Sequence, residues 1–389
     1  MRSNYKQLGE FIRQVDIRNT GGKEENLLGV SVQKNFMPSI ANTVGTDFKK
    51  YKVVKKGQFT YIPDTSRRGD KIGIALLEDY AEGLVSNIYT VFEVIDEEQL
   101  LPEYLMLWFK RAEFDRYARF KSHGSVREIF DWDEMCNVEL PVPPIEEQRK
   151  IVKGYQAITD RIELKKRIND NLEATAQAIF QEQFALHYGA DDLPNGYNIV
   201  TLDSVCTVKG GKRLPADCEL FDTPTEHPYI RVRDVGNNRY VCLTDQFQYI
   251  DEETHLAISR YIVNTDDIII SIVGTIGLLG KVHSSLNKAN LTENCVKLAD
   301  IHTVTSDYLY YTLCYKKQIK EIELLTVGAV QAKLPMYNIQ SMKILVPPTG
   351  VIEEFQEKMN VFNRQIEANT IEIQRLYELQ EILLAKLSN

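Results

Sequence analysis

The sequence predicts an α/β protein with two mixed α/β domains in tandem, each followed by a long helix, and with the two helices paired as an antiparallel coiled coil. Three observations lead to this fold class: an internal repeat over most of the chain, short β-branched runs with turn residues inside each copy, and heptad spacing after each copy. The length of 389 residues is sufficient for two or three domains of ordinary size.

The repeat is the observation that decides the domain organisation. The segment GSVREIFDWDEMCNVELPVPP, from Gly124, aligns without gaps on GAVQAKLPMYNIQSMKILVPP, from Gly328, so the two copies are offset by 204 residues. The same offset relates YLMLWF at Tyr104 to YLYYTL at Tyr308. Further upstream the offset varies, but the pattern of apolar runs persists. The chain therefore arose by internal duplication, and its order is domain, helix, domain, helix.

Each copy has the signals of a mixed α/β domain. DIIISIV at residues 267–273 is typical of a buried strand, Gly274 marks a turn, and helices are expected after Pro102 and Ser306. A Val-Pro-Pro tripeptide closes each copy, because paired prolines end the preceding element and suit the first turn of a helix. We therefore place the first domain at 1–144, its helix and spacer at 145–188, the second domain at 189–348 and the C-terminal helix at 349–389.

The helices after the two Val-Pro-Pro tripeptides carry heptad seams with polar interruptions. Each seam needs a partner, and the other helix is the nearest. Because the first helix leads into the second domain and the second helix starts there, the pair must be antiparallel. At 1.5 Å per residue, about 35 residues give a rod of roughly 50 Å, which we expect to relate the two domains by a pseudo-two-fold axis. The seam positions are Ile151, Tyr155, Ile158, Ile162, Lys165, Asn169, Leu172, Ala176, Ile179 and Gln183 in the first helix, and Ile352, Phe355, Met359, Phe362, Ile366, Asn369, Ile373, Leu376, Gln380, Leu383 and Leu387 in the second.

Composition excludes several classes of protein. The net charge of −9, from 46 basic and 55 acidic residues, argues against a protein that coats nucleic acid without sequence preference. No apolar run is long enough to span a bilayer, and the N-terminus lacks the apolar core of a signal peptide, so we expect a cytoplasmic protein. The six cysteines form no CxxC pair, which argues against a zinc site or a disulfide framework.

Motifs of catalysis are missing as well. The sequence contains no Asn-Pro-Pro-Tyr or Asp-Pro-Pro-Tyr tetrapeptide of a DNA methyltransferase and no GxxxxGK[ST] phosphate-binding loop. GTIG at 274–277 lacks the lysine of such a loop, so a tight turn between strands is the better interpretation. Asp160, Glu163 and Lys165 resemble the acidic and lysine elements of some nucleases, but they lie on the heptad helix, where salt-bridging charges are expected. We therefore predict no catalytic residue and no metal site.

Several tracts resemble a known family. VELPVPPIEEQRKIV with ITDRIELKKRINDNLEATAQAIF is similar to the central helical repeat of type I restriction–modification specificity subunits, and DDIIISIVGTIGLLG with ENCVKL is similar to the core of their target recognition domains. The resemblance spans nearly the whole chain and occurs twice in the expected order. Two departures stand out: VPPTGVIEEFQ predicts a longer or differently built turn into the second helix, and SRRGDKIGIA replaces GTIG in the first half. Half-sites of different sequence are the expected consequence.

The resemblance implies a non-catalytic DNA-specificity subunit. Each target recognition domain would recognise one half of a bipartite, asymmetric site in double-stranded DNA, and the helices would set the spacing and dock two modification subunits. Those methyltransferase subunits would supply S-adenosylmethionine and methylate adenine, and restriction subunits would cleave DNA with ATP and Mg²⁺. The chain itself would carry no cofactor.

DNA contacts need Lys, Arg or small polar side chains on the loops of the domains, for phosphates and for base edges. The net charge suggests that DNA is bound well only together with the modification subunits. The candidates are Lys49, Lys52, Lys55, Arg67, Arg68, Lys121, His123, Ser125 and Arg127 in the first half, and Lys209, Lys212, Arg213, Arg231, Arg233, Lys281, Gln331 and Lys333 in the second.

Two other hypotheses remain open at this point. A coiled-coil scaffold that binds proteins would show no salt-dependent DNA binding, and a self-contained restriction enzyme would bind a cofactor of its own.

Overall fold

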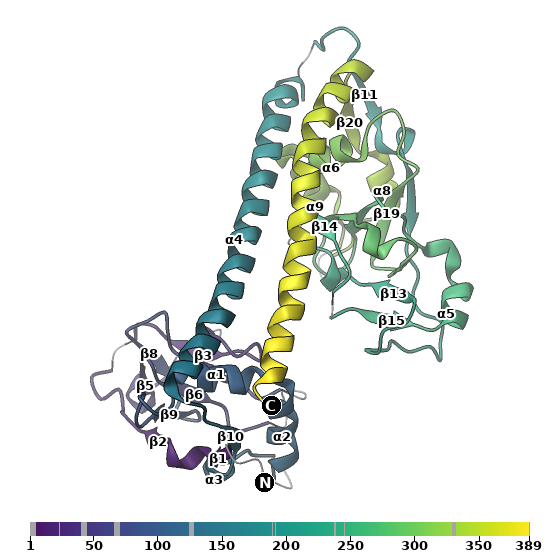
Figure 1. Cartoon of the computed structure of the whole chain (residues 1–389). Coiled ribbons are helices and arrows are strands. Elements are labelled where there is room, and N and C mark those ends of the chain that lie inside the picture. The colour runs from purple at the N-terminus through teal and green to yellow at the C-terminus, as the bar shows by residue number, and fades with distance from the viewer. Residues whose placement is uncertain are drawn as a thin grey trace. The chain divides into compact units, whose positions relative to one another are not determined.

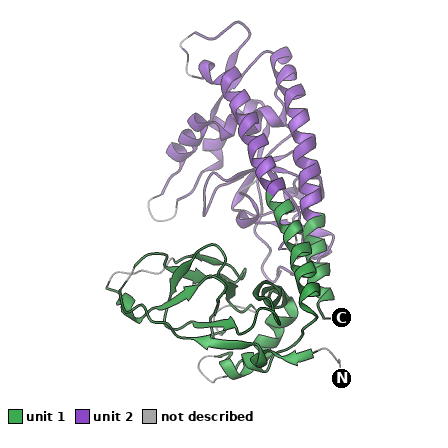
Figure 2. Ribbon diagram, turned by 60° about the vertical axis from the view of Figure 1, so that its left-hand side comes forward, with its two compact units in different colours: residues 1–163, 375–389 green, residues 164–374 purple. Residues whose placement is uncertain are grey.

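The structure is a computed structural model. It describes residues 5–388 except 23, 40–44, 66–70, 124–127, 189, 191, 237–238, 245 and 329–331. The chain divides into two compact units, unit 1 with residues 1–163 and 375–389, and unit 2 with residues 164–374 (Figure 2). Each long helix contributes residues to both units, so the units cut across the boundaries expected from the sequence, and those boundaries stay a prediction.

Unit 1 is built on an antiparallel sheet with the strand order β2-β9-β6-β7. Phe59 of β6 and Phe92 of β9 are paired in this sheet, and their rings stack at 4.8 Å between centroids. Phe109 packs edge-on against both rings from the helical side. Among the described residues its strands are β1 (Tyr5–Gln7), β2 (Ile12–Val15), β3 (Leu28–Val30), β4 (Phe36–Pro38), β5 (Lys52–Lys55), β6 (Phe59–Tyr61), β7 (Ile74–Leu76), β8 (Glu82–Val85), β9 (Thr90–Val94) and β10 (Glu139–Pro141), and its α-helices α1 (Pro102–Lys110), α2 (Ala112–Lys121) and α3 (Trp132–Cys136).

Unit 2 has a sheet of the same kind, in the order β12-β19-β16-β17, extended by β14, which pairs parallel to β17. A second sheet, β15-β13-β18, packs around Tyr229 and Ile250. Among the described residues its strands are β11 (Asn198–Thr201), β12 (Thr207–Gly210), β13 (His227–Ile230), β14 (Tyr240–Val241), β15 (Gln248–Ile250), β16 (Ile268–Ser271), β17 (Leu279–Val282), β18 (Asn290–Leu291), β19 (Cys295–Ala299) and β20 (Lys343–Val346), and its shorter α-helices α5 (Glu252–Ala257), α6 (Ser306–Cys314), α7 (Lys316–Leu325) and α8 (Met336–Ser341).

The duplication is confirmed element by element. Helices α1 and α2 become α6 and α7 when their bounds are moved by 204 residues. The ladder Phe59↔Phe92 in unit 1 corresponds to Ile268↔Leu298 in unit 2, and the β1-β10 pair corresponds to β11-β20. The mixed α/β class predicted for each copy is therefore correct.

The long helices are α4 (Ile145–Phe184) and α9 (Thr349–Lys386), which run side by side in Figure 1. Each begins directly after its proline pair, at positions 204 residues apart. The prediction of a longer or differently built turn before the second helix is therefore wrong. Thr349 and Gly350 form the first turn of α9, and the amide of Val351 donates to the carbonyl of Pro348 as the amide of Glu147 does to that of Pro144. Over the described residues, no helix combines the length and the apolar character needed to cross a membrane.

The helices pair in antiparallel fashion, as predicted. In unit 2, Lys165 lies 2.8 Å from Glu372, and the Asn369 amide donates to Asn169 at 2.7 Å. In unit 1, the Gln380 amide donates to the Thr159 hydroxyl at 2.8 Å. Earlier residues of α4 therefore contact later residues of α9, which is the antiparallel arrangement. All predicted seam residues are buried or half-buried.

The centre of the pair has local two-fold character. Lys165 donates to Asn369 at 3.0 Å, and these two positions are repeat equivalents, 204 residues apart. A residue that faces its own equivalent lies beside a local two-fold axis. That this axis also relates the two recognition domains stays a prediction.

The end of α4 forms part of the core of unit 2. Phe180 and Phe184 are fully buried there among Tyr308, Tyr311 and Phe355. We expect Phe180→Ala to lower the free energy of unfolding of unit 2 by about 3–5 kcal/mol, because truncation of a buried aromatic side chain loses burial and leaves a cavity. Urea unfolding followed by far-UV circular dichroism measures the change. Leu164→Ala, at an exposed position of the same helix, is the control and should change stability by less than about 0.5 kcal/mol.

Candidate nucleic-acid interface

In unit 2, the ends of three neighbouring strands lie together along one side of the large sheet, which we call the strand-end edge. The pairs Gly210↔Val296 and Ser271↔Cys295 bring the end of β12, the end of β16 and the start of β19 together. The next residue, Gly211, passes so close to this edge that a Cβ atom there would lie 2.0 Å from the carbonyl oxygen of Thr292. Only glycine fits such an approach, so the sequence fixes where Lys212 and Arg213 leave the sheet.

The GTIG segment forms the turn between β16 and β17 at the same edge. Gly274 and Gly277 both have φ of +81°, and the Ser271 hydroxyl donates to the carbonyl of Thr275 at 2.6 Å and accepts from the amide of Leu278 at 2.8 Å. It is thus a tight turn, as predicted. Lys333 joins this edge through a β-bridge to Val273. We call Lys212, Arg213, Thr275 and Lys333 the strand-end surface of unit 2.

Unit 1 has an equivalent arrangement. Asp64, shortly after β6, forms a β-bridge to Ile129, and Ile129 also forms a β-bridge to His123. The amide of Thr65 donates to the carbonyl of Glu128 at 3.0 Å, and its hydroxyl donates to Ser122 at 2.9 Å. The residues that flank 66–70 therefore lie beside those that flank 124–127. The candidates Arg67, Arg68, Ser125 and Arg127, and Gln331 in unit 2, lie outside the described residues.

Most of the other candidates are accessible to a ligand. Arg213 is 82% exposed at its side chain although it lies 2.7 Å from Glu293, and Lys209 is half-exposed at 3.9 Å from Asp300. Lys121 is partly exposed and lies 3.3 Å from Glu134. Such surface ion pairs contribute little, so phosphate can replace the carboxylate. The exposed candidates are Lys49, Lys55, His123, Lys209, Lys212, Arg213, Arg233 and Lys333.

Three candidates are engaged inside the protein. Lys281 is 2% exposed, with its ammonium 2.5 Å from Asp307 and 3.0 Å from Asp266. Arg231 closes a capping box with Asp234, and Lys52 donates to the carbonyl of Tyr89 at 2.8 Å. These positions do not fit a phosphate contact, because the cation already has a protein partner and little access to solvent. Sequence cannot separate Lys281 from Lys333, since burial of a lysine depends on a counterion that is remote in the chain.

Sequence reasoning missed a buried charge cluster in unit 2. Asp307 of α6 is 3% exposed and accepts from Lys281, from the guanidinium of Arg239 and from two amides of α9. Burial alone would raise the pKa of Asp307, but the charges of Lys281 and Arg239 outweigh it and hold that pKa well below its ordinary value. Glu173 of α4 lies 3.5 Å from Arg239, and burial raises the pKa of this carboxyl.

The lowered pKa of Asp307 predicts a pH dependence. A carboxyl group whose pKa is lower in the folded chain stabilises the fold above its unfolded value, near about 3.9, and this contribution is lost as the pH falls towards the folded value. We therefore expect unit 2 to lose stability below about pH 4, and Asp307→Asn to show a smaller loss. The opposite contribution of Glu173 is common to both chains. Urea unfolding across this range measures both curves; parallel curves would show that Asp307 does not contribute.

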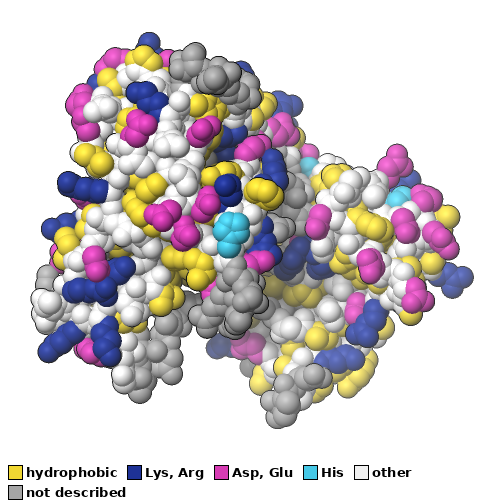
Figure 3. Space-filling model, turned by 90° about the horizontal axis from the view of Figure 1, so that it is seen from below, with side chains coloured by type: hydrophobic (Ala, Val, Ile, Leu, Met, Phe, Trp, Pro, Cys, Tyr) yellow, Lys and Arg dark blue, Asp and Glu magenta, His cyan; other side chains and the backbone are white. Residues whose placement is uncertain are grey.

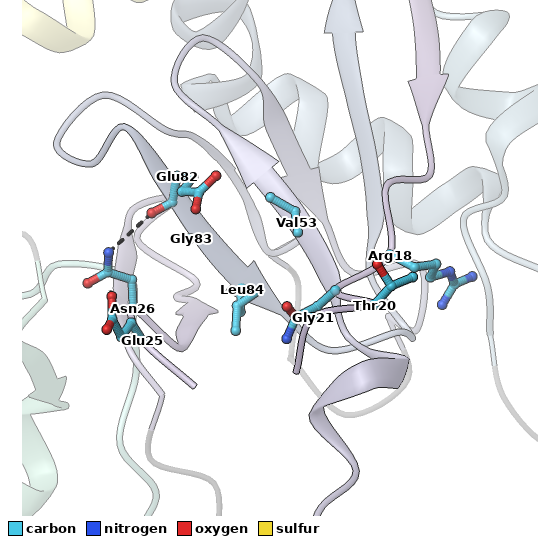
Figure 4. A pocket seen from close by; sticks show the side chains of 10 residues that line it. Arg18, Thr20, Gly21, Glu25, Asn26, Val53, Glu82, Gly83 and Leu84 are labelled. Carbon is cyan, nitrogen blue, oxygen red and sulfur yellow. Dashed lines mark hydrogen bonds between the residues drawn. The ribbon is translucent and has the colours of Figure 1, made fainter. Parts of the chain in front are cut away.

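No group of three or more His, Cys, Asp or Glu residues is placed to hold a metal in the described part of the chain. A pocket of about 220 Å³ in unit 1 is lined by Arg18, Glu25, Asn26 and Glu82 among others (Figure 4). The Asn26 amide donates to the carbonyl of Glu82 at 3.3 Å, and Arg18 is paired with Asp16. On the face drawn in Figure 3, basic and acidic side chains are interspersed.

Comparison with known proteins gives this duplicated fold a family. Residues 9–174 and 194–383 each match the family described as "Type I restriction modification DNA specificity domain". The chain belongs to this family. With two such domains in tandem, it is a type I specificity subunit, as the resemblance predicted.

Relatives agree with this assignment. The specificity subunit is 25% identical over 317 residues to the type I restriction enzyme MjaIX specificity subunit of Methanocaldococcus jannaschii, covering 76% of this chain and 70% of that one. It is 21% identical over 421 residues to the HindI specificity subunit of Haemophilus influenzae, with 90% of each chain covered. A crystal structure of a type I restriction–modification S subunit from M. genitalium has the same fold, with a TM-score of 0.50, 16% identity, and coverage of 99% of this chain and 96% of that one.

Proposed function

We propose that each domain of this specificity subunit recognises one half of a bipartite, asymmetric DNA site. The observation that carries the proposal is that two copies of one specificity domain present different side chains at equivalent positions. Lys333 of the strand-end surface corresponds to Ile129 in unit 1, and exposed His123 corresponds to Val327. Different side chains on the same scaffold select different bases, since base-edge recognition depends on donors and acceptors in fixed geometry.

Affinity for DNA is expected to depend on partner subunits. The net charge of −9 opposes DNA binding by the chain alone, whereas exposed Lys212, Arg213 and Lys333 supply local phosphate contacts. Two modification subunits would add positive surface around the duplex.

The helix pair is the proposed docking site for those subunits. Apolar side chains are exposed along it, at Leu164 of α4 and at Val361, Tyr377, Leu379 and Ile382 of α9. Exposed apolar side chains on paired helices suit a partner protein. Methylation with S-adenosylmethionine, and cleavage with ATP and Mg²⁺, would then reside in partner subunits. Because its ligand is DNA, we expect the complex to act in the cytoplasm.

Methylome sequencing tests the proposed function. A host that carries this chain with its modification subunit is compared with a host that lacks only this chain. We expect methyladenine at one asymmetric split motif in the first host and its loss in the second, because the modification subunit alone has no means of selecting the site. An unchanged methylome, with both subunits expressed, would contradict the proposal and favour a protein-binding scaffold.

A further inference from the structure

One carboxylate in unit 2 joins the recognition domain to α9. Asp307 accepts from Lys281 of β17 at 2.5 Å and from the guanidinium of Arg239 on the domain side. On the helix side, its other oxygen accepts from Gln356 of α9 at 2.7 Å and from Asn363, one heptad later, at 2.5 Å. Four donors thus converge on a side chain that is 3% exposed.

The same cluster reaches α4. The Arg239 guanidinium, with 1% of its side chain exposed, lies 3.5 Å from Glu173 of α4 and donates to the hydroxyl of Tyr311 at 2.9 Å. That hydroxyl donates in turn to Glu173, also at 2.9 Å. The recognition domain is therefore tied by directional contacts to both helices within unit 2.

The hydrogen bonds and ion pairs of this network restrict the orientation of the domain on its helices more than the surrounding apolar contacts do. Phe180, Phe355 and Met359 pack against the domain from the same helices, and apolar packing tolerates small shifts with little loss. Buried charges, by contrast, are costly to leave without their partners, so hydrogen bonds to a buried carboxylate favour the arrangement in which they form. A network of this kind is better suited to fix orientation than to add stability.

The first half of the chain has no such network at the equivalent positions. Asp307 corresponds to Glu103, which is exposed, and Tyr311 corresponds to Leu107. In the sheet, Lys281 corresponds by its ladder position to Leu76. Gln356 and Asn363 correspond to Val152 and Thr159. Among the described residues, these equivalent positions of the first half therefore form no such network.

We infer that Asp307 is a positioning residue, which fixes the second recognition domain on its helix pair and thereby restricts the spacing between half-sites that the subunit accepts. The inference rests on the proposed function. Asp307 itself would touch no base, and its effect is transmitted through Gln356, Asn363 and Glu173.

The test severs the links to α9 and leaves the buried ion pairs intact. The double variant Gln356→Ala and Asn363→Ala suits helix α9, because alanine favours helices. The complete complex with the modification subunit methylates a plasmid library in which the two half-sites are separated by the parental spacer or by one base pair more or fewer. Glu357→Ala, at an exposed position next to Gln356, is the matched control.

We expect the half-site sequences to stay unchanged. Methylation at the shifted spacers should rise at least about tenfold relative to the parental spacer, since each of the two hydrogen bonds removed has about the free energy of a tenfold change in an equilibrium. Asp307→Asn, which keeps the shape of the side chain, should also broaden the range of spacer lengths that the complex methylates. If methylation instead falls at every site and only the parental spacer is still accepted, the network merely stabilises the fold. That result would overturn the inference. A parent complex that methylates no split motif would overturn the proposed function, and the inference with it.

Discussion

Asp307→Ala is expected to destabilise unit 2 by about 3–5 kcal/mol, because removal of one partner leaves buried charges without compensation. As acidic partners among the described residues, Arg239 would keep Glu173, at 3.5 Å, and Lys281 would keep the exposed Asp266, at 3.0 Å. The lost acceptor also leaves the amides of Gln356 and Asn363 without their buried partner. This is a larger loss than that of any surface ion pair of the chain.

The two tryptophans give this prediction a clean measurement. Trp108 and Trp132 both lie in unit 1, so tryptophan fluorescence follows unit 1, whereas far-UV circular dichroism follows both units. We expect urea to unfold the Asp307→Ala variant at lower concentration by circular dichroism, with the fluorescence transition unchanged. Glu103→Ala, at the exposed repeat equivalent, should match the parent by both signals. An Asp307→Ala transition that coincides with the parent's would show that the buried pairs contribute no net stability.

Patterns that depend on neighbours in sequence were predictable. The seam residues Phe355, Met359 and Ile366 are buried where heptad spacing placed them, and both long helices begin after their proline pairs. The repeat was equally informative, because two copies of one pattern must form the same local structure. The seam pattern was incomplete at the helix ends: Phe180, Phe184 and Leu384 are buried there as well, because the helix ends pack into domain cores.

Features that depend on partners remote in sequence were not predictable. Lys281 and Lys333 look alike as lysines beside a strand, but Lys281 meets Asp307 across the fold, while Lys333 is exposed. The Asp307 network combines α4, α6 and α9, and no spacing rule relates Glu173, Arg239 and Asp307 before the fold is known. Basic residues near turns therefore predicted a nucleic-acid interface, but not which of the lysine and arginine side chains are exposed to a ligand.

The length of the helix pair is expected to set the distance between the two half-sites. Residues 158–164 of α4 face residues 374–380 of α9, as the Thr159–Gln380 contact indicates. Deletion of both heptads keeps the seam in register and leaves the polar contacts of Asn369 with Lys165 and Asn169 in place. Seven residues span about 10 Å of helix, or roughly three base pairs of DNA. We therefore expect the methylated motif to keep both half-sites and to lose about three base pairs of spacer.

The same deletion should abolish methylation of the parental motif. A domain that no longer reaches its half-site loses contacts worth about 1–3 kcal/mol for each base pair, so a fall of at least about a hundredfold is expected. Three base pairs also rotate the duplex by roughly 100°, whereas a heptad returns the helix to the same face, so methylation of the shortened site should be slower than parental. Deletion of 158–164 alone is the control, because it puts the two seams out of register and should impair folding. A folded, assembled double-deletion variant that still methylates the parental spacer would show that something other than the helix pair sets the spacing.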